Sequence, residues 1–396
     1  MRNLVLFIAL IFIGSCIDRL NYTAPSIYTK NVIVVDGSIT DEPGPYRIRL
    51  TNPIKVDGAI AYSSFTEQAV SVRRVTLSDD VGNSEELEEI NKGIYQTKPD
   101  GMRGAIGRSY SIRIETFDDK IFESTPDKME PVGAVDSIYY EFEAFQSQDP
   151  LSTYGYRVYI DAHDTPGGDN YVRWKFTGTY VVETLPQYKL AGASGPPTNC
   201  PSPAPYPCSG WSLVNGRLKK GTYKLNDSTH LYEYQGYFDC TCCRCWVTQS
   251  EDQPHVSNKQ FVENGKFHKI EVGFVPINYY TFFEKYRIEV QQMSLSQTAF
   301  YYWRAFQTQE RASGSLFQPV TGKIPTNLSE INGSEVLGIF YASAVKKKQI
   351  YLDGKNLSHY IRIPVDCLGR EGASGEICTN VFFPFATFHK PDDWVN

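Results

Sequence analysis

Short segments in which apolar and polar residues alternate recur throughout the sequence, and they restrict the chain to a β-rich fold. In YRIRLT, residues 46–51, every second residue is apolar, and YRIEV, residues 286–290, repeats the pattern. A period of two places the apolar side chains on one face of a strand. The 27 Tyr and 22 Phe residues favour strands, and 30 Gly and 23 Pro supply turns between them. We therefore expect a mainly β protein.

Seven such segments lie in the first third of the chain and predict one domain. Turn-forming sequences such as DEPGP, residues 41–45, and DDVGN, residues 79–83, separate them. Seven short strands in about a hundred residues are typical of an immunoglobulin-like β-sandwich, which we place at residues 31–126. The expected strands cover residues 32–40, 46–51, 70–77, 87–90, 94–97, 109–116 and 121–124.

A second, larger β-sandwich domain is predicted at residues 133–396, after a linker at PDKMEP, residues 126–131. Its clearest strand segments are SIYYEFEAF, YRVYIDA, NYVRWKFTGTYVVE, HKIEVGFV and KYRIEVQQM. One helix is expected in SLSQTAFYYWRAFQTQERASG, where Ser294 or Ser296 can cap the start and Gly314 can end the helix. An insertion at about residues 191–245 is rich in Pro, Gly and Cys and lacks a core of its own, so disulfides are its expected source of order.

The N-terminus, MRNLVLFIALIFIGSC, has the pattern of an export signal. Its apolar run is too short to cross a bilayer, which needs about twenty residues. We predict a signal peptide at residues 1–15. The last four residues, IGSC, resemble the bacterial lipobox, so we expect a lipidated Cys16 and a tether over residues 16–30. More than one acyl chain would anchor the mature protein to the outer membrane, whereas an ordinary secreted protein is the alternative.

Four cysteines crowd into FDCTCCRCW, residues 238–246, as two interleaved C-x-x-C pairs. This spacing also occurs in zinc sites and in dithiol redox sites. Disulfides are favoured, because an exported chain meets oxidising conditions and eight of its nine cysteines remain after Cys16. In a strand, Cys242 and Cys243 would point to opposite faces and need different partners. The disulfide candidates are Cys200, Cys208, Cys240, Cys242, Cys243, Cys245, Cys367 and Cys378.

Several longer stretches resemble a family of Bacteroidota surface lipoproteins that is catalogued only as a domain of unknown function. They include VVDGSITDEPGPYRIRL, PVGAVDSIYYEFE and CTNVFFPFATFHKPDDW, and the most specific are SGSLFQP and GIFYASAV. Phe382 and Phe383 replace the Gly-Gly that usually follows the last cysteine in the family. Its members are commonly encoded beside SusC-like TonB-dependent outer-membrane transporters. The resemblance therefore implies a transporter-associated surface protein, and it supplies no catalytic motif.

The segment DAHDTPGGDN, residues 161–170, is a candidate calcium loop. Asp161, Asp164 and Asp169 lie close together in it, and calcium takes six or more oxygen ligands. Their spacing is not that of an EF-hand, so a solvated loop between strands is the favoured interpretation. We expect no metal and no other cofactor.

Two tripeptides, DSI at residues 136–138 and DST at residues 227–229, resemble the O-glycosylation signal of Bacteroidota. Ser137 and Ser228 are therefore candidate acceptors, although three-residue patterns also recur by chance.

The net charge and the absence of known catalytic motifs limit the classes of function that we expect. The net charge is −6 and no basic block occurs, which argues against a nucleic-acid partner. The sequence contains no G-x-S-x-G, H-E-x-x-H or P-loop motif, so an enzyme is not expected. We expect a lipoprotein on the extracellular face of the outer membrane that docks on a SusC-like TonB-dependent transporter and captures or gates its substrate. A free-standing glycan-binding surface lipoprotein is the alternative, favoured by the aromatic content, and a hydrolase is a third hypothesis.

Overall fold

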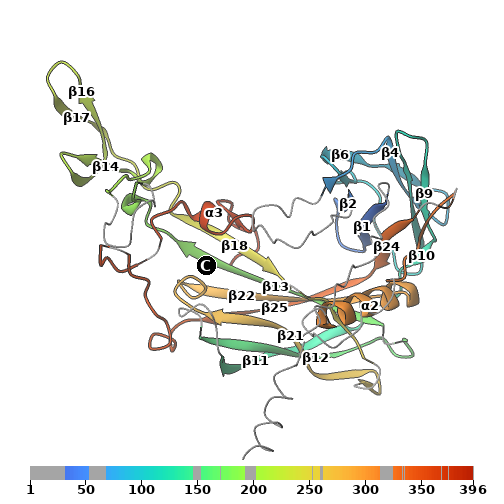
Figure 1. Ribbon diagram of the computed structural model, residues 1–396. Coiled ribbons are helices and arrows are strands. Elements are labelled where there is room, and N and C mark those ends of the chain that lie inside the picture. Colours follow the sequence, from blue (N-terminus) through green and yellow to red (C-terminus); the bar gives the residue numbers. More distant parts are fainter. Residues whose placement is uncertain are drawn as a thin grey trace, which may run out of the picture.

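The chain forms two β-sandwiches that meet at a junction, and an arm projects from the second sandwich (Figure 1). The computed structural model describes residues 32–52, 68–145, 153–169, 171–191, 202–251, 253–258, 262–312, 324–331, 333, 335–366, 368–372 and 374–395. The predicted signal peptide, Cys16 and the tether lie outside the described residues. No helix within the described residues is long and apolar enough to span a membrane. The expectation of a mainly β protein is confirmed.

Two sheets form the first sandwich, and all seven strands predicted for it are present. In β8, for example, Tyr110, Ile112 and Ile114 are buried and the residues between them are not. One sheet contains β24 (Val336–Ser343), β1 (Ile33–Thr40), β2 (Arg47–Asn52), β7 (Ile94–Gln96) and β6 (Glu88–Asn91), with β3 (Gln68–Ala69) beside β2. The other contains β23 (Leu328–Glu330), β9 (Ile121–Ser124), β8 (Ser109–Glu115), β4 (Arg74–Asp79) and β5 (Ser84–Glu86), with β10 (Asp127–Lys128) beside β8.

The first sandwich is completed by strands from far along the chain. β24 runs parallel to β1, from Val336 opposite Ile33 to Ser343 opposite Thr40, and β23 pairs with β9. Phe340 of β24 is fully buried in the core of the first sandwich. The predicted boundaries at 31–126 and 133–396 are therefore wrong for residues 328–343. Alternation of apolar and polar residues indicates that a segment is a strand, but it does not indicate which sheet the strand joins.

The second sandwich also has two sheets, and its core is centred on Trp174. The Trp174 ring meets the edge of Phe267 at a centroid distance of 4.9 Å, and its Nε1 donates a hydrogen bond of 2.9 Å to Gln292 Oε1. One sheet has the order β11 (Ala134–Ala144), β12 (Tyr154–His163), β21 (Lys266–Ile277) and β20 (Val262–Glu263). The other has the order β25 (Val345–Asp353), β22 (Lys285–Ser294), β13 (Val172–Glu183), β18 (Arg244–Ser250) and β26 (Ala386–Thr387), with β19 (His255–Val256) beside β13.

Helix α2 (Gln297–Ala312) packs at the junction of the two sandwiches (Figure 1). Ser296 caps it, because Ser296 Oγ accepts a hydrogen bond of 3.1 Å from the Ala299 N–H, while Gly314 lies outside the described residues. The predicted linker at residues 126–131 is wrong in part. Its Asp127 belongs to β10 and is only 4% exposed.

Asp127 joins three elements that are distant in sequence. Its Oδ1 accepts a hydrogen bond from the Ser296 hydroxyl, and its Oδ2 accepts one of 2.9 Å from the Ala342 N–H in β24. Burial raises the pKa of this carboxyl, and the two hydrogen bonds oppose that shift. Asp127 therefore ties the end of the first predicted domain to the helix cap and to β24.

Replacement of Asp127 should destabilise the junction. Asp127→Ala removes the acceptor of the buried Ala342 N–H and of the half-buried Ser296 hydroxyl, so we expect the free energy of unfolding to fall by about 2–4 kcal/mol in urea denaturation. Asp119→Ala is the control. Asp119 pairs with Arg73 at 2.7 Å on the surface, with side-chain exposures of 79% and 46%, and its loss should change stability by less than about 1 kcal/mol. Equal effects of the two substitutions would contradict the role of Asp127.

Candidate functional site

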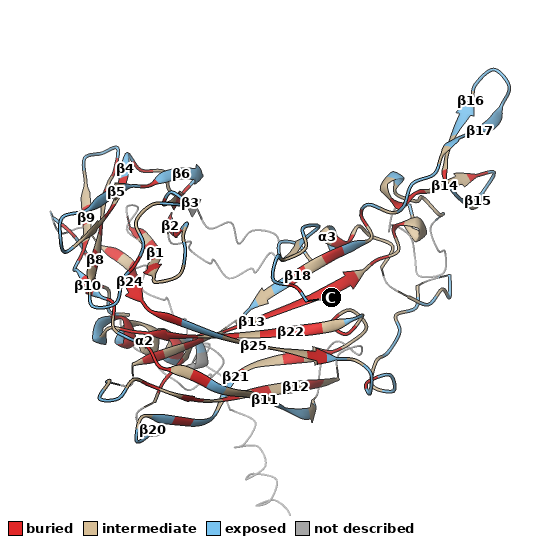
Figure 2. Cartoon of the chain, turned by 180° about the vertical axis from the view of Figure 1, so that it is seen from behind, coloured by how far each residue is buried: buried red, intermediate tan, exposed pale blue. Residues whose placement is uncertain are grey.

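The arm, residues 202–243, presents two small hairpins to solvent. The first pairs β14 (Trp211–Val214) with β15 (Arg217–Lys220), and the second pairs β16 (Thr222–Asn226) with β17 (Leu231–Gly236). The β16–β17 hairpin lies at the far end of the arm (Figure 1). Most of this hairpin has the colour of exposed residues in Figure 2, and the rest has the intermediate colour.

One face of the β16–β17 hairpin is apolar. Tyr223 lies opposite Tyr234 and Leu225 lies opposite Tyr232, so these four side chains share a face. The Tyr223 and Tyr234 rings meet edge to face at 5.3 Å. Leu225 is 43% exposed, Tyr232 36% and Tyr234 57%. We call these four residues the apolar face of the hairpin.

The other face of the hairpin is mainly polar, with the exposed Leu231 opposite Asn226 as its apolar member. Lys224 lies opposite Glu233, and Asn226 Nδ2 donates a hydrogen bond of 2.6 Å to Glu233 Oε1. This two-faced pattern is typical of a sheet that buries one side, yet the described part of the chain leaves the apolar face largely uncovered. An isolated two-stranded hairpin is only marginally stable in water, so burial of this face against another molecule would stabilise it.

Disulfides hold the base of the arm. Cys208 is bonded to Cys242 and Cys240 to Cys243. The Thr241 N–H also donates a hydrogen bond of 3.0 Å to the Cys208 carbonyl. The Cys208–Cys242 disulfide and this hydrogen bond fix the two ends of the arm to each other, because a cross-link reduces the conformational freedom of the segment that it closes, whereas Cys240–Cys243 closes only a short loop at one end.

Gly210 permits a close approach at the same place. It has a φ of +73°, and a Cβ atom there would lie 2.4 Å from the Phe238 carbonyl oxygen. Only glycine fits this position without a shift of the backbone.

The disulfide expectation is confirmed for six of the eight candidates. The third pair, Cys245 with Cys378, joins β18 to the short helix α3 (Cys378–Val381), and both residues are fully buried. Cys200 and Cys367 lie outside the described residues. As expected, Cys242 and Cys243 have different partners, but the assumed strand is wrong for them, because residues 241–243 form bends and β18 begins at Arg244.

Cations accompany the aromatic residues of the arm. Lys220 Nζ lies 4.6 Å from the centre of the Tyr237 ring, and a hydrogen bond with the Tyr237 hydroxyl raises the pKa of the Lys220 ammonium group. The Lys219 Nζ lies 5.7 Å from the centre of the Tyr223 ring. The arm therefore combines apolar contact area with positive charge.

The three carboxylates of the candidate calcium loop do not form a common site. Asp161 accepts hydrogen bonds from Ser137 and Tyr139 and from the Lys269 N–H, and the last of these lowers the pKa of Asp161. Asp164 is buried and accepts a hydrogen bond from the Thr165 N–H, whereas Asp169 is exposed. No group of three or more His, Cys, Asp or Glu side chains in the described residues is arranged to hold a metal.

The two candidate glycosylation positions differ in accessibility. Ser228 lies in the exposed turn at the tip of the β16–β17 hairpin. Ser137 is half-buried in β11, and its hydroxyl donates a hydrogen bond of 3.3 Å to Asp161. Ser228 is therefore the more accessible acceptor.

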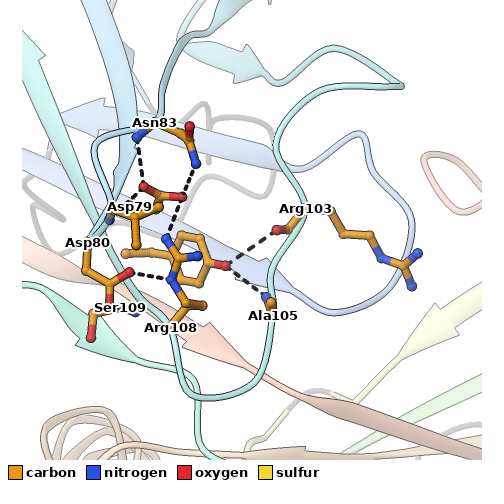
Figure 3. Close-up of polar contacts among 9 residues, drawn as sticks. Asp79, Asp80, Asn83, Arg103, Ala105, Arg108 and Ser109 are labelled. Atoms are coloured by element: carbon orange, nitrogen blue, oxygen red, sulfur yellow. Dashed lines mark hydrogen bonds and ion pairs between the residues drawn. The ribbon is translucent and has the colours of Figure 1, made fainter.

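A polar cluster in the first sandwich closes the turn between β4 and β5 (Figure 3). Arg108 pairs with Asp79 at 2.9 Å and with Asp80 at 2.5 Å, and Asp79 also accepts hydrogen bonds from the backbone and side chain of Asn83. Desolvation opposes ionisation of Asp79, but the hydrogen bonds from Asn83 hold its pKa below the ordinary value. A hydrogen bond from Arg108 likewise lowers the pKa of Asp80. These interactions fix a turn, and each of the three charges has a partner.

The apolar face of the hairpin was not predicted, although the sequence contains a signal for it. Tyr223 and Leu225 alternate before the turn-forming segment NDSTH, residues 226–230, and Tyr232 and Tyr234 alternate after it. Alternation on both sides of such a turn is a hairpin signal. The cysteines and prolines on either side of this segment favour the prediction made above, an insertion at about residues 191–245 that lacks a core and is ordered by disulfides.

Comparison with known protein families shows which family the chain is similar to. A family model described as "Domain of unknown function (DUF4249)" matches residues 18–349, which include both hairpins of the arm and β24. No curated protein matches the chain.

Removal of the Cys208–Cys242 disulfide should loosen the arm without unfolding the sandwiches. In a Cys208→Ser/Cys242→Ser variant, we expect limited proteolysis to cut within residues 202–243 at least about tenfold faster, because a cross-link of this kind stabilises a closed loop by 2 kcal/mol or more. Mass spectrometry of the fragments identifies the cleavage sites. The body of the protein should keep its melting temperature. An arm that resists proteolysis as well as the wild type does would contradict this role.

Proposed function

This chain belongs to the DUF4249 family, and we propose that it is an outer-membrane lipoprotein that docks on a SusC-like TonB-dependent transporter and helps to capture or gate its substrate. The IGSC segment supports an anchor at Cys16, and the sequence resemblance supports a transporter as the partner. The lipid would keep the protein on the membrane that contains the transporter.

The uncovered apolar face of the β16–β17 hairpin is the observation that favours docking. Tyr232 and Tyr234 supply the large, amphipathic side chains that are enriched at the centres of protein interfaces. The Cys208–Cys242 disulfide closes the base of the arm, so the arm loses less conformational freedom when a partner binds. The polar face remains in water, as the rim of an interface does.

Docking can be tested with variants of the two hairpin faces. A Tyr232→Ser/Tyr234→Ser variant loses two aromatic side chains, so we expect recovery of the SusC-like transporter to fall at least about tenfold when the tagged, lipidated protein is purified from outer membranes in mild detergent. Quantitative mass spectrometry measures the recovery.

A Lys224→Ser/Glu233→Ser variant changes the same strands on the polar face and serves as the matched control. It should recover the transporter as the wild type does. Equal recovery of the transporter by the two variants would refute docking through the apolar face. If the anchored wild-type protein recovers no transporter, the proposal that a SusC-like transporter is the partner is refuted.

A free-standing glycan-binding protein is the second candidate, and a group of partly exposed rings favours it. Tyr140 and Phe142 of β11 are each 45% exposed. The Phe142 ring lies 5.7 Å from Tyr154 and 4.8 Å from Tyr360, and such rings can stack on the apolar faces of sugars. For this function, we expect the purified protein to bind neutral glycans on an array without any transporter, and Phe142→Ala to weaken that binding. An array without signal would exclude it.

A further inference from the structure

A cavity of about 350 Å³ opens where the two sandwiches meet, and we call it the junction pocket. Its walls come from β1 and β2 of the first sandwich, from β13 of the second, and from α2 and β24 at the junction. These elements converge beside α2 in Figure 1. The volume lies in the range of pockets that hold small molecules.

Two strands from different sandwiches each direct two cations into this pocket. Arg47 and Arg49 line it from β2, on either side of Ile48, which is buried in the first core. Arg173 and Lys175 line it from β13, on either side of Trp174, which is buried in the second core. Because side chains alternate along a strand, burial of the central residue fixes the two cations on the opposite face. The two cores thus set the position of the four positive charges.

Arg173 forms the rigid floor of the junction pocket. Its guanidinium lies 3.8 Å from the centre of the Trp303 ring, and its Nη2 pairs with Glu251 at 2.6 Å. Its Nη1 donates a hydrogen bond of 3.3 Å to the Tyr341 hydroxyl. The side chains of Arg173 and Glu251 are only 11% and 5% exposed, so the charge is held in place before any ligand arrives.

The pocket has an excess of positive charge and of hydrogen-bond donors. Among the described residues, the lining of the pocket contains four cations and one carboxylate, Asp36, and Arg173 also pairs with Glu251, although the whole chain carries a net charge of −6. Arg173 Nε and Trp303 Nε1 are buried and have no hydrogen-bond acceptor among the described residues. Buried donors normally have an acceptor, so the local shortage of acceptors matches a ligand that supplies them.

We propose that the junction pocket binds an oxyanion, a carboxylate or phosphate group, carried by a molecule about the size of a monosaccharide. Guanidinium groups recognise both kinds of oxyanion through paired hydrogen bonds, and Lys175 adds a point charge. The site needs neither the arm nor a transporter, so it is independent of the proposed docking function.

Calorimetric titration of the full-length protein in mild detergent tests the proposal. The probes are glucuronate and glucose 6-phosphate, with glucose as the neutral control. At least one of the anions should bind about tenfold or more tightly than glucose, and added salt should weaken that binding because it screens the charges. Comparison of the two anions shows whether the site prefers a carboxylate or a phosphate. Equal binding of all three sugars, or no binding of either anion, would overturn the proposal.

Variants assign the binding to this pocket. Lys175→Gln and Arg49→Gln should each weaken anion binding about tenfold, because each removes one charged contact. Arg74→Gln is the matched control, since Arg74 pairs with Glu86 at 3.5 Å on the surface of the first sandwich and does not line the pocket. Melting temperatures establish that the variants are folded. Wild-type affinity in both pocket variants would overturn the assignment, whatever the result of the transporter experiment.

Discussion

A buried polar network holds the two sandwiches in one relative position. Asp127 accepts hydrogen bonds from the cap of α2 and from the backbone of β24. Nearby, Ser294 Oγ donates to the Glu130 carbonyl at 2.6 Å and accepts from the Ala344 N–H at 2.9 Å. Buried polar groups must be paired, and few arrangements satisfy all of these donors and acceptors at once. The junction pocket lies between the two bodies that this network joins, so its geometry depends on it.

Different interactions determine the structures of the arm and of the junction pocket. The arm buries little of its own surface and depends on covalent links at Cys208, Cys240, Cys242 and Cys243, which leave an apolar face available for a partner. The pocket instead depends on two hydrophobic cores, which direct charged side chains into one cavity. Apolar contact suits a large partner surface, whereas fixed charge suits a small anion. One chain therefore offers two recognition surfaces with separate requirements.

Local features of the fold could be predicted from the sequence, but pairings between distant segments could not. Alternation identified seven strands of the first sandwich, and Ser296 was correctly named as one of two possible helix caps. The parallel pairing of β24 with β1 leaves no local pattern, since each strand alternates in the same way whatever its neighbour. The pocket escaped prediction for the same reason. Arg49 and Lys175 are far apart in sequence, and only the junction brings them together.

The late position of β24 has a consequence for biosynthesis. β1 has no parallel neighbour until residues 336–343 have reached the compartment in which the chain folds, so the first sandwich cannot complete its core while only the N-terminal part is present. Contacts across such a separation are slow to form, because the closure of a long loop costs entropy before the contact stabilises it. The N-terminal strands therefore emerge early, and the edge of β1 that pairs with β24 stays unpaired until most of the chain has followed. Such an edge can pair with other molecules, which makes the interval before completion the period of greatest risk of aggregation and of greatest need for chaperones.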